Sequence, residues 1–333
     1  MTTKQTENFL EIRGLKKYFV AGRSSFFSRE ERHVHAVDGV SLSLRRSEVI
    51  ALVGESGCGK STLGLLLMGL EDPSEGTVKF EDRDITHLND GQRKDLRRKI
   101  QMVFQDPYES LNPTQTIRDI INEPLLVHGI GTTQQERDER VKKAMEDSGL
   151  KPADVYLNRY PHELSGGQRQ RVVIAAALVL EPEIIIADEP VSMLDVSIRA
   201  EVINLLADLR ITRQIAVIFI THDLGSVGFF ADRVAVMYLG RIVEIGTMLE
   251  VLEKPQHPYT KALISVIPVP NPRLRHERII LQGETPNPIN IPSGCRFHPR
   301  CPVAVDACKL SDPPFVSLSK THRAACLLIT GNK

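Results

Sequence analysis

The chain reads Gly54-Glu55-Ser56-Gly57-Cys58-Gly59-Lys60-Ser61 at residues 54–61, and this stretch decides its fold. It fits the phosphate-binding pattern G-x-x-x-x-G-K-S/T at every defined position. The apolar residues 49–53 before it predict a buried parallel strand, and residues 62–68 after it predict a helix. A glycine-rich loop at a helix N-terminus presents backbone N–H groups and the positive end of the helix dipole to an anion. The stretch therefore predicts a phosphate site in an α/β domain.

The defined positions of this loop have separate roles. Gly54, Gly57 and Gly59 let the backbone turn tightly around a ligand. Lys60 is expected to reach the β- and γ-phosphates of a nucleotide, and Ser61 is expected to bind Mg²⁺. The alternative, a glycine-rich turn with a chance lysine, leaves the flanking strand and helix unexplained.

Composition narrows the class of protein. The chain has 333 residues, of which 41% are hydrophobic, so it can bury a sizeable core. Lysine plus arginine equals aspartate plus glutamate, 42 each, which argues against a nucleic-acid partner held by bulk positive charge. The first residues lack the apolar core of a signal peptide, and the longest strongly apolar run, 172–180, is far short of a membrane span. We expect an intracellular protein that does not itself cross a bilayer.

Four more candidate residues come directly after apolar runs that predict strands: Gln105, Asp188, Glu189 and His222. In an open parallel sheet, ligands bind at the carboxyl ends of the strands. Gln105 is suited to bind Mg²⁺ or position a water, and Asp188 to hold Mg²⁺. Glu189 is placed to polarise an attacking water, and His222 to contact a γ-phosphate or fix that water. The constellation is more specific than any one of these residues.

A second anion site is expected at residues 164–168, Leu-Ser-Gly-Gly-Gln, directly before a helical stretch over 169–180. Ser165 is a suitable N-cap, and the two glycines allow close backbone approach. Nothing in the first site needs this second helix N-terminus, so it is expected to serve another nucleotide. Upstream of the phosphate loop, Tyr18 or Phe19 could stack on an adenine ring or simply pack in the core.

Together these motifs resemble the ATP-binding cassette (ABC) subunit of a transporter over residues 9–250. In that family, residues 54–61 are Walker A, Gln105 is the Q-loop and 164–168 is the signature. Residues 184–189 are Walker B with the catalytic glutamate, residues 192–195 are the D-loop, and His222 is the H-switch. The resemblance implies an α/β fold: a parallel-sheet core with an antiparallel β subdomain and a helical subdomain over about 106–180.

The resemblance also implies a head-to-tail dimer with two ATP molecules at its interface, each held by Walker A of one subunit and the signature of the other. It assigns catalytic roles to Glu189, His222, Lys60 and Gln105, and Mg²⁺ binding to Ser61, Gln105 and Asp188. The residues that it places around ATP are Phe19, Gly54, Glu55, Ser56, Gly57, Cys58, Gly59, Lys60, Ser61, Thr62, Gln105, Ser165, Gly166, Gly167, Gln168 and Asp188.

A narrower resemblance rests on residues 105–113, 257–260 and 294–302, which are similar to segments of the oligopeptide/dipeptide importer ATPases. It implies ATP hydrolysis coupled to peptide import at the cytoplasmic face of the inner membrane. The implied partners are a second, related ABC ATPase, two membrane permeases and, indirectly, an extracytoplasmic peptide-binding protein.

Alternatives stay open at this point. Importers of nickel, glutathione or oligosaccharides share these ATPase motifs. Soluble ABC proteins of translation or DNA repair usually carry two cassettes or a long coiled-coil insertion, and the sequence shows neither. A module that binds ATP without hydrolysing it is at odds with the intact Glu189 and His222.

Residues 251–333 are expected to form a proline-rich C-terminal extension. Four cysteines spaced C-x5-C-x6-C-x17-C lie in it: Cys295, Cys301, Cys308 and Cys326. Four thiolates can hold Zn²⁺ or an iron–sulfur cluster, and the lack of C-x2-C pairs favours a cluster. The resemblance adds to this, since related importer ATPases carry a 4Fe–4S cluster in this tail. Zinc, free thiols and a disulfide remain alternatives. His298 and His322 are possible ligands but are expected on the surface.

Overall fold

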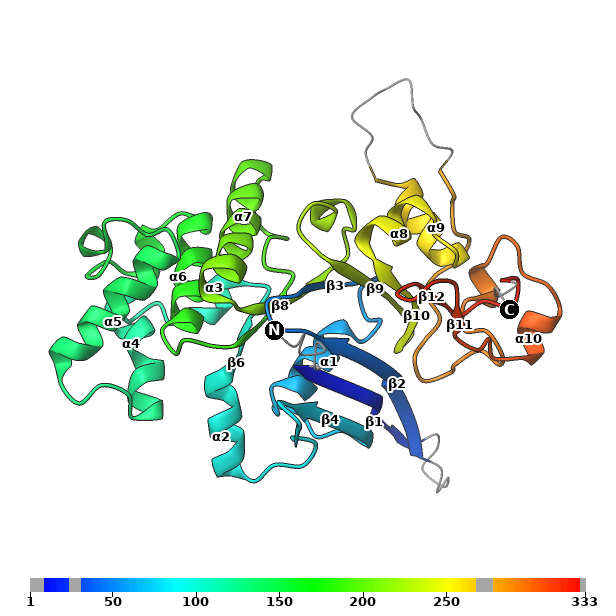
Figure 1. The fold of residues 1–333 in the computed structure, drawn as a ribbon, viewed down its shortest axis with the longest axis horizontal. Coiled ribbons are helices and arrows are strands. Elements are labelled where there is room, and N and C mark those ends of the chain that lie inside the picture. Colours follow the sequence, from blue (N-terminus) through cyan, green and yellow to red (C-terminus); the bar gives the residue numbers. More distant parts are fainter. Residues whose placement is uncertain (1–8, 24–30, 268–277, 330–333) are drawn as a thin grey trace, which may run out of the picture.

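The computed structural model of the chain describes residues 9–23, 31–267 and 278–329. Two sheets and a group of helices build most of it, and Figure 1 shows the helices α3–α6 at one end and the C-terminal segment at the other. The larger sheet has the strand order β11-β12-β10-β9-β3-β8-β7-β6. Its strands are β3 Val49–Val53, β6 Ile100–Val103, β7 Ile184–Asp188, β8 Ala216–Thr221, β9 Arg233–Tyr238, β10 Arg241–Thr247, β11 Val316–Ser317 and β12 Arg323–Ala324.

The middle of this sheet is parallel, from β9 through β3, β8 and β7 to β6. The strands β10, β12 and β11 continue it in antiparallel fashion at one edge. Every residue of β3, β7 and β8 is buried, as expected for parallel strands covered on both faces. The register pairs Val53 with Thr221 and Asp188 with Ile220, so the strands end at the same edge.

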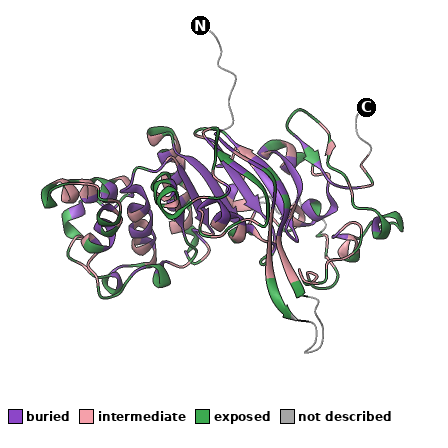
Figure 2. Cartoon of the chain, turned by 90° about the horizontal axis from the view of Figure 1, so that it is seen from below, coloured by how far each residue is buried: buried purple, intermediate pink, exposed green. Residues whose placement is uncertain are grey.

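The smaller sheet is antiparallel, in the order β2-β1-β4-β5. Its strands are β1 Leu10–Arg23, β2 Glu31–Leu44, β4 Glu75–Phe80 and β5 Arg83–Asp84. Figure 2 shows that β1 and β2 run out from the buried core to an exposed end. Residues 24–30, which connect these strands, lie outside the described part of the chain.

Helices cover both faces of the larger sheet. The α-helices are α1 Lys60–Leu67, α2 Asp90–Lys99, α3 Pro107–Ser110, α4 Ile117–His128, α5 Gln134–Asp147, α6 Gly166–Leu178, α7 Val196–Arg213, α8 Met248–Glu253, α9 Pro258–Ser265 and α10 Ala307–Leu310. The short 3₁₀ helices are η1 Ala153–Val155, η2 Pro161–Glu163, η3 Gly225–Val227 and η4 His298–Arg300. In the described ranges, no helix is both long enough and apolar enough to span a membrane.

Two hydrophobic cores lie on opposite faces of the larger sheet. Alternate residues of β3 divide between them: Val49, Ala51 and Val53 belong to one core, and Ile50 and Leu52 to the other. The first core also holds the buried residues of α4–α6, and the second those of α1 and the smaller sheet. The larger sheet is therefore fixed on both faces, which makes its strand ends a rigid platform for a site.

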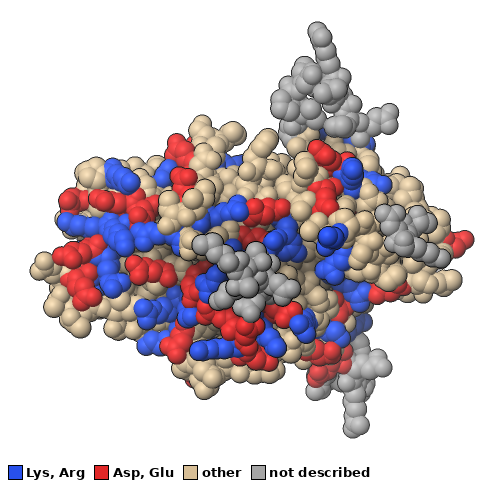
Figure 3. Space-filling view, viewed as in Figure 1, with Lys and Arg blue, Asp and Glu red and all other residues tan. Residues whose placement is uncertain are grey.

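The surface carries both signs of charge side by side, as Figure 3 shows for one face. On α2, Lys99 Nζ lies 2.9 Å from carboxylate oxygens of both Glu81 and Glu183, and Arg93 pairs with Asp72 at 2.6 Å. Two of the basic residues of α2 are thus paired with acidic neighbours. This agrees with a mixed, solvated surface.

Candidate active site

The phosphate loop connects β3 to α1, and its conformation depends on glycine. Gly59 is the N-cap of α1, has φ 103° and provides no side-chain cap. A Cβ at Gly59 would lie 1.9 Å from the carbonyl oxygen of Ala36, and one at Gly54 would lie 2.2 Å from that of Met237. The buried Lys60 donates from Nζ to the carbonyl oxygens of Gly54 and Glu55, at 2.8 and 2.9 Å. The ammonium group is therefore held inside the loop, where a phosphate needs a cation.

A pocket of about 300 Å³ lies over this loop. Its walls come from the small sheet, from the loop, from two strand ends and from the C-terminal segment. The lining residues are Phe19, Val34, Ala36, Ser56, Gly57, Gly59, Lys60, Ser61, Thr62, Gln105, Glu189 and Pro288. A cavity of this size above a phosphate loop, with an aromatic wall, suits a nucleotide.

Of the two aromatic candidates, only Phe19 lines this pocket. The Tyr18 hydroxyl donates instead to Asp38 Oδ1 at 2.6 Å, and burial together with that carboxylate raises the pKa of Tyr18. Of the two aromatic residues that the sequence offered, Phe19, which the family resemblance also favoured, is therefore the one beside the phosphate loop.

The strand-end residues gather around Glu189. Its Oε2 lies 3.0 Å from His222 Nδ1 and 3.5 Å from Gln105 Nε2. Glu189 has φ 45°, a left-handed conformation that is uncommon for a residue other than glycine, and its N–H donates to Ile220 O at 2.9 Å. The turn directs the carboxylate away from β7 and toward the ends of the neighbouring strands. Such strained residues concentrate at functional sites.

Asp188, one residue earlier, is buried. Burial raises the pKa of its carboxyl, and a hydrogen bond with Ser61 opposes that shift. A buried carboxylate beside the phosphate-loop serine is stabilised in its ionised form by a nearby cation.

The signature residues 165–168 do not join this site. Ser165 is exposed and caps α6 by a reciprocal pair of bonds: Gln168 N–H donates to Ser165 Oγ at 3.3 Å, and Ser165 N–H donates to Gln168 Oε1 at 3.0 Å. The residues that line the nucleotide pocket include no member of 165–168.

Sequence reasoning missed the contribution of the C-terminal segment. Pro288 lines the pocket, and Thr285 and Arg300 bond to the side chain of Glu55. Arg300 falls in one of the segments similar to peptide importers, but no local pattern shows where its guanidinium group points. Val34 and Ala36 were missed as well, because nothing in the sequence gives the register of β2 against the loop.

The four C-terminal cysteines are free thiols in the structure. Cys295 N–H donates to Cys308 O at 2.8 Å, so two of their segments touch. Burial raises the pKa of the Cys295 thiol to about 11, and the other three thiols add to the shift. Within the described ranges, no three Cys, His, Asp or Glu side chains are gathered closely enough to hold a metal ion. The predicted cluster is therefore not supported by the arrangement of side chains.

One expectation about this region was wrong. His322 is only 4% exposed, and its Nε2 lies 2.7 Å from Oε1 of Glu244, which is fully buried. His298 is half-buried, with Nδ1 2.9 Å from Cys295 O. The histidine–carboxylate contact compensates the burial of two polar groups, which a proline-rich sequence does not reveal.

Solved structures of ATP-binding cassettes share this fold. The chain matches cbiO1 from Clostridium perfringens, described as part of the ABC transporter complex cbiONQ, with a TM-score of 0.65 and 30% identity, over 74% of this chain and 92% of that one. A dimeric, post-hydrolysis structure of the cassette MJ0796 bound to ADP and Pi matches with a TM-score of 0.63 and 29% identity, over 72% of this chain and 98% of that one. The ABC transporter family model matches residues 37–192. Fold and site together define an ATP-binding cassette, and the predicted fold class is confirmed.

Curated relatives narrow the class further. The chain is 50% identical over 331 residues to the oligopeptide transport ATP-binding protein AppF of Bacillus subtilis, covering 98% of this chain and 99% of the relative. It is 48% identical over 332 residues to the dipeptide transport ATP-binding protein DppF of Haemophilus influenzae, covering 99% and 100%. A family model of the oligopeptide/dipeptide transporter C-terminal region matches residues 243–308. The chain belongs to the family of oligopeptide and dipeptide transport ATP-binding proteins, as its motifs predicted.

Proposed function

We propose that this chain hydrolyses ATP to drive the import of di- or oligopeptides by a membrane complex. The observation that carries the proposal is the position of Glu189, between His222 and Gln105 at the edge of a pocket over the phosphate loop. Peptides are favoured as cargo over nickel, glutathione or oligosaccharides because the relatives named above are oligopeptide and dipeptide transport proteins.

Residues of the loop bind and orient the triphosphate. The N–H groups at the start of α1 have no side-chain cap, so they are available to phosphate oxygens. Lys60 exchanges its bonds to loop carbonyls for bonds to the β- and γ-phosphates. Phe19 is placed to stack on the base.

Ser61, Asp188 and Gln105 fit a Mg²⁺ ion, because they offer oxygen ligands and Asp188 is a buried carboxylate that a cation would stabilise. When bound, the ion neutralises charge on the β- and γ-phosphate oxygens.

Glu189 acts on the attacking water. A water placed between its carboxylate and the γ-phosphate donates a proton toward Glu189 as it attacks. His222 holds this carboxylate through Nδ1, 3.0 Å from Oε2, and Gln105 Nε2 lies 3.5 Å from the same oxygen. These contacts keep Glu189 oriented toward the phosphate.

The dimer is supported by residues left outside the pocket. Ser165, exposed at the N-terminus of α6, is free to contact the γ-phosphate of a second ATP bound by a related subunit. Met193 in the D-loop and Val196 directly after it are exposed apolar side chains that such an interface would cover. We propose a heterodimer with a second ABC ATPase, in which this chain contributes a cassette over residues 9–250 and a C-terminal extension over 251–333. Residues 268–277 and 330–333 of that extension lie outside the described residues.

We propose that the permease contacts the chain near Gln105. Phe104 and Tyr108 are exposed aromatic side chains there, and the Arg169 guanidinium lies 4.2 Å from the centre of the Tyr108 ring. Exposed aromatic residues with an arginine are enriched in protein interfaces. The chain would thus dock at the cytoplasmic face of the membrane on two permeases, which receive peptide from an external binding protein.

The test is ATPase activity of the reconstituted complex with peptide-loaded binding protein. Glu189→Gln is expected to lower turnover by about 100-fold or more, while Glu139→Gln, an exposed glutamate of α5, is the matched control. If another solute stimulates ATP hydrolysis and peptide does not, the cargo is that solute and the proposed peptide cargo is wrong. Turnover that survives Glu189→Gln would show that this subunit does not perform the hydrolysis.

A cluster site is a second candidate, and we propose that the four C-terminal thiols hold a 4Fe–4S cluster, with Zn²⁺ as the alternative. Its support is the set of four cysteines and the contact between the Cys295 and Cys308 segments. The described thiols would have to turn toward one another to bind it. Iron and sulfide analysis with absorption spectra of anaerobically purified protein tests this. Protein that carries neither iron nor zinc would rule it out.

A further inference from the structure

Two side chains of the C-terminal extension form hydrogen bonds to Glu55 of the phosphate loop. Arg300 makes two bonds to the carboxylate of Glu55: Nη1 to Oε2 at 2.7 Å and Nη2 to Oε1 at 3.1 Å. The hydroxyl of Thr285 also donates to Glu55 Oε2. The Arg300 side chain is only 10% exposed and that of Glu55 30% exposed, so the pair is partly shielded from water. A two-point arginine–carboxylate pair in such a place fixes geometry as well as charge.

The backbone of the same residue is held as well. Glu55 N–H donates to the Tyr259 hydroxyl oxygen at 2.9 Å. Tyr259 is fully buried and packs against Tyr238 and Phe297, with ring centres 4.8 and 5.4 Å away. Tyr259 and Phe297 both lie C-terminal to the cassette motifs, so the loop rests on side chains that those motifs do not include.

The segment that bonds Glu55 also reaches the pocket wall. Pro288 lines the nucleotide pocket together with Phe19. Its carbonyl oxygen accepts from His35 N–H on β2 at 3.1 Å. Between Thr285 and Pro288, the extension therefore spans the distance from the phosphate loop to the wall formed by the smaller sheet.

The ion pair between Arg300 and Glu55 affects the charge of the phosphate site. A carboxylate in a loop that binds phosphates repels the ligand unless its charge is compensated. Burial works against ionisation of Glu55, but the hydrogen bonds from Arg300 and Thr285 outweigh it and lower its pKa. Glu55 thus stays anionic, and Arg300 is the group that neutralises it.

We propose that the C-terminal extension completes the ATP site of its own subunit: Arg300 is a positioning residue that neutralises and holds Glu55 of the phosphate loop, and Pro288 closes the pocket wall. The inference rests on the proposed ATPase function and adds a positioning role for residues outside the cassette motifs.

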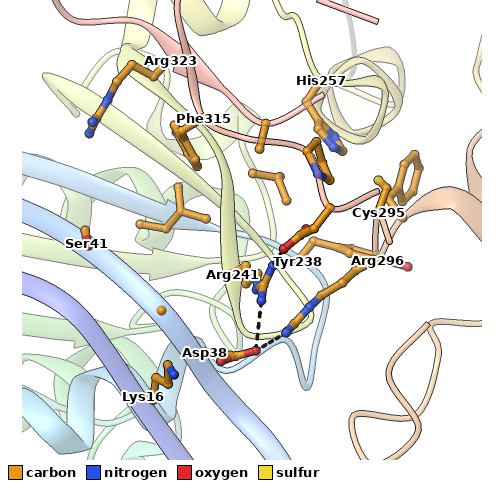
Figure 4. Close-up of a pocket in the computed structure, with 17 residues that line it drawn as sticks. Lys16, Asp38, Ser41, Tyr238, Arg241, His257, Cys295, Arg296, Phe315 and Arg323 are labelled. Atoms are coloured by element: carbon orange, nitrogen blue, oxygen red, sulfur yellow. Dashed lines mark hydrogen bonds and ion pairs between the residues drawn. The ribbon is translucent and has the colours of Figure 1, made fainter. Parts of the chain in front are cut away.

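The extension has other attachments, so loss of Arg300 should not undock it. Figure 4 shows Arg296 and Arg241 converging on Asp38 of β2. Arg296 also donates to Leu239 O, and it is buried. Arg296 is therefore a matched control: an arginine of the same extension whose carboxylate partner, Asp38, is not part of the phosphate loop.

The experiment measures KM and kcat for ATP, and the affinity of a fluorescent ATP analogue, in the full chain and in the reconstituted complex. Arg300→Ala is expected to raise KM and weaken analogue binding by about tenfold, with kcat changed less than about twofold. Arg296→Ala is expected to lower Tm but leave KM within about twofold. Arg300→Lys should restore part of the affinity, because it keeps the charge without the two-point contact.

The decisive variant is Glu55→Gln in the Arg300→Ala background. If Arg300 neutralises Glu55, removing the carboxylate returns KM to within about twofold of the wild-type value. An unchanged KM in Arg300→Ala, an equal rise in Arg296→Ala, or no rescue by Glu55→Gln would each overturn the inference. Should Arg300→Ala fail to fold, Arg300→Lys compared with the double variant Glu55→Gln/Arg300→Lys decides the same question. Glu189→Gln in the same assay separates the two proposals: if it abolishes turnover while Arg300→Ala changes nothing, only the inference fails.

Discussion

Two helix N-termini in this molecule look alike in sequence and differ in structure. The helix α1 follows a glycine-containing loop, and α6 begins with two glycines, Gly166 and Gly167. At α1, the N-cap is Gly59, which offers no side chain to the first N–H groups. At α6, Ser165 and Gln168 satisfy each other's backbone N–H groups in a capping box. The first helix lies under a pocket within its own chain, and the second does not contribute to that pocket.

The difference in capping indicates different roles for the two helix N-termini. An uncapped helix end in a pocket needs an anion from solution, since no side chain caps its first N–H groups. The exposed N-terminus of α6 is satisfied by its own capping box, so it is stable without a ligand. It is therefore suited to contact a nucleotide that is bound by another subunit. In the proposed dimer, a monomer with both motifs would hold only half of each nucleotide site.

The largest expected effect concerns the α1 turn. Gly59→Ala should abolish nucleotide binding, with a loss of about 100-fold or more, because its Cβ meets the Ala36 carbonyl oxygen and φ 103° is strained for alanine. Gly57→Ala, with φ 77° but open space around its Cβ, should lose about tenfold or less. Binding of a fluorescent ATP analogue measures both. Equal losses of binding would mean that the positive φ, and not the close approach of β2, is the reason why the loop requires glycine.

The next effect concerns the α6 turn. Ser165→Asp keeps an N-cap of equal strength but places a negative charge where a γ-phosphate is expected. Turnover of the complex should fall by about 100-fold, while the isolated chain binds the analogue as before. Thr133→Asp at the N-cap of α5 is the matched control, since Thr133 accepts from Glu136 N–H at 3.2 Å on an exposed helix. Full turnover in Ser165→Asp would contradict the shared site.

The same contrast explains how much could be predicted from the sequence. The α1 site was predictable because its motif is contiguous and the remaining groups follow parallel strands whose ends are aligned by the sheet register. The Glu55–Arg300 pair was not, because its members are 245 residues apart and an ion pair leaves no local pattern. His322 was misplaced for a related reason: its buried partner Glu244 is 78 residues away.

The four C-terminal cysteines show another limit of prediction from the sequence. Spacing identifies four cysteines that share a segment, but it does not give the directions of their side chains. In the described residues those thiols do not form a metal site. Composition predicted the extension as a proline-rich addition, whereas the packing of Phe297 against Tyr238 and Tyr259 makes it part of the cassette's own core.

The smallest expected effect concerns a third helix N-terminus, that of α8. At α8, Thr247 and Glu250 form a capping box, and Ser319 and Thr321 of the extension donate to the same carboxylate. Partial burial alone would raise the pKa of Glu250, but these hydrogen bonds outweigh it and lower the pKa to about 2. The unfolded chain takes up this proton near pH 4.5, so the stabilisation is complete above that pH and is lost as pH falls from 4.5 toward 2.

Urea unfolding at a series of pH values measures this effect. At neutral pH, Glu250→Gln should lower the free energy of unfolding by about 0.5–1 kcal/mol, because Glu250 is partly exposed and solvent screens the contact. The difference between the variant and the wild type should shrink as pH falls below 4.5. Glu253→Gln, an exposed residue of the same helix, is the control. A difference that stays constant with pH would show that the Glu250 carboxylate contributes shape and not charge, and α8 would then differ from α1 in needing no anion at all.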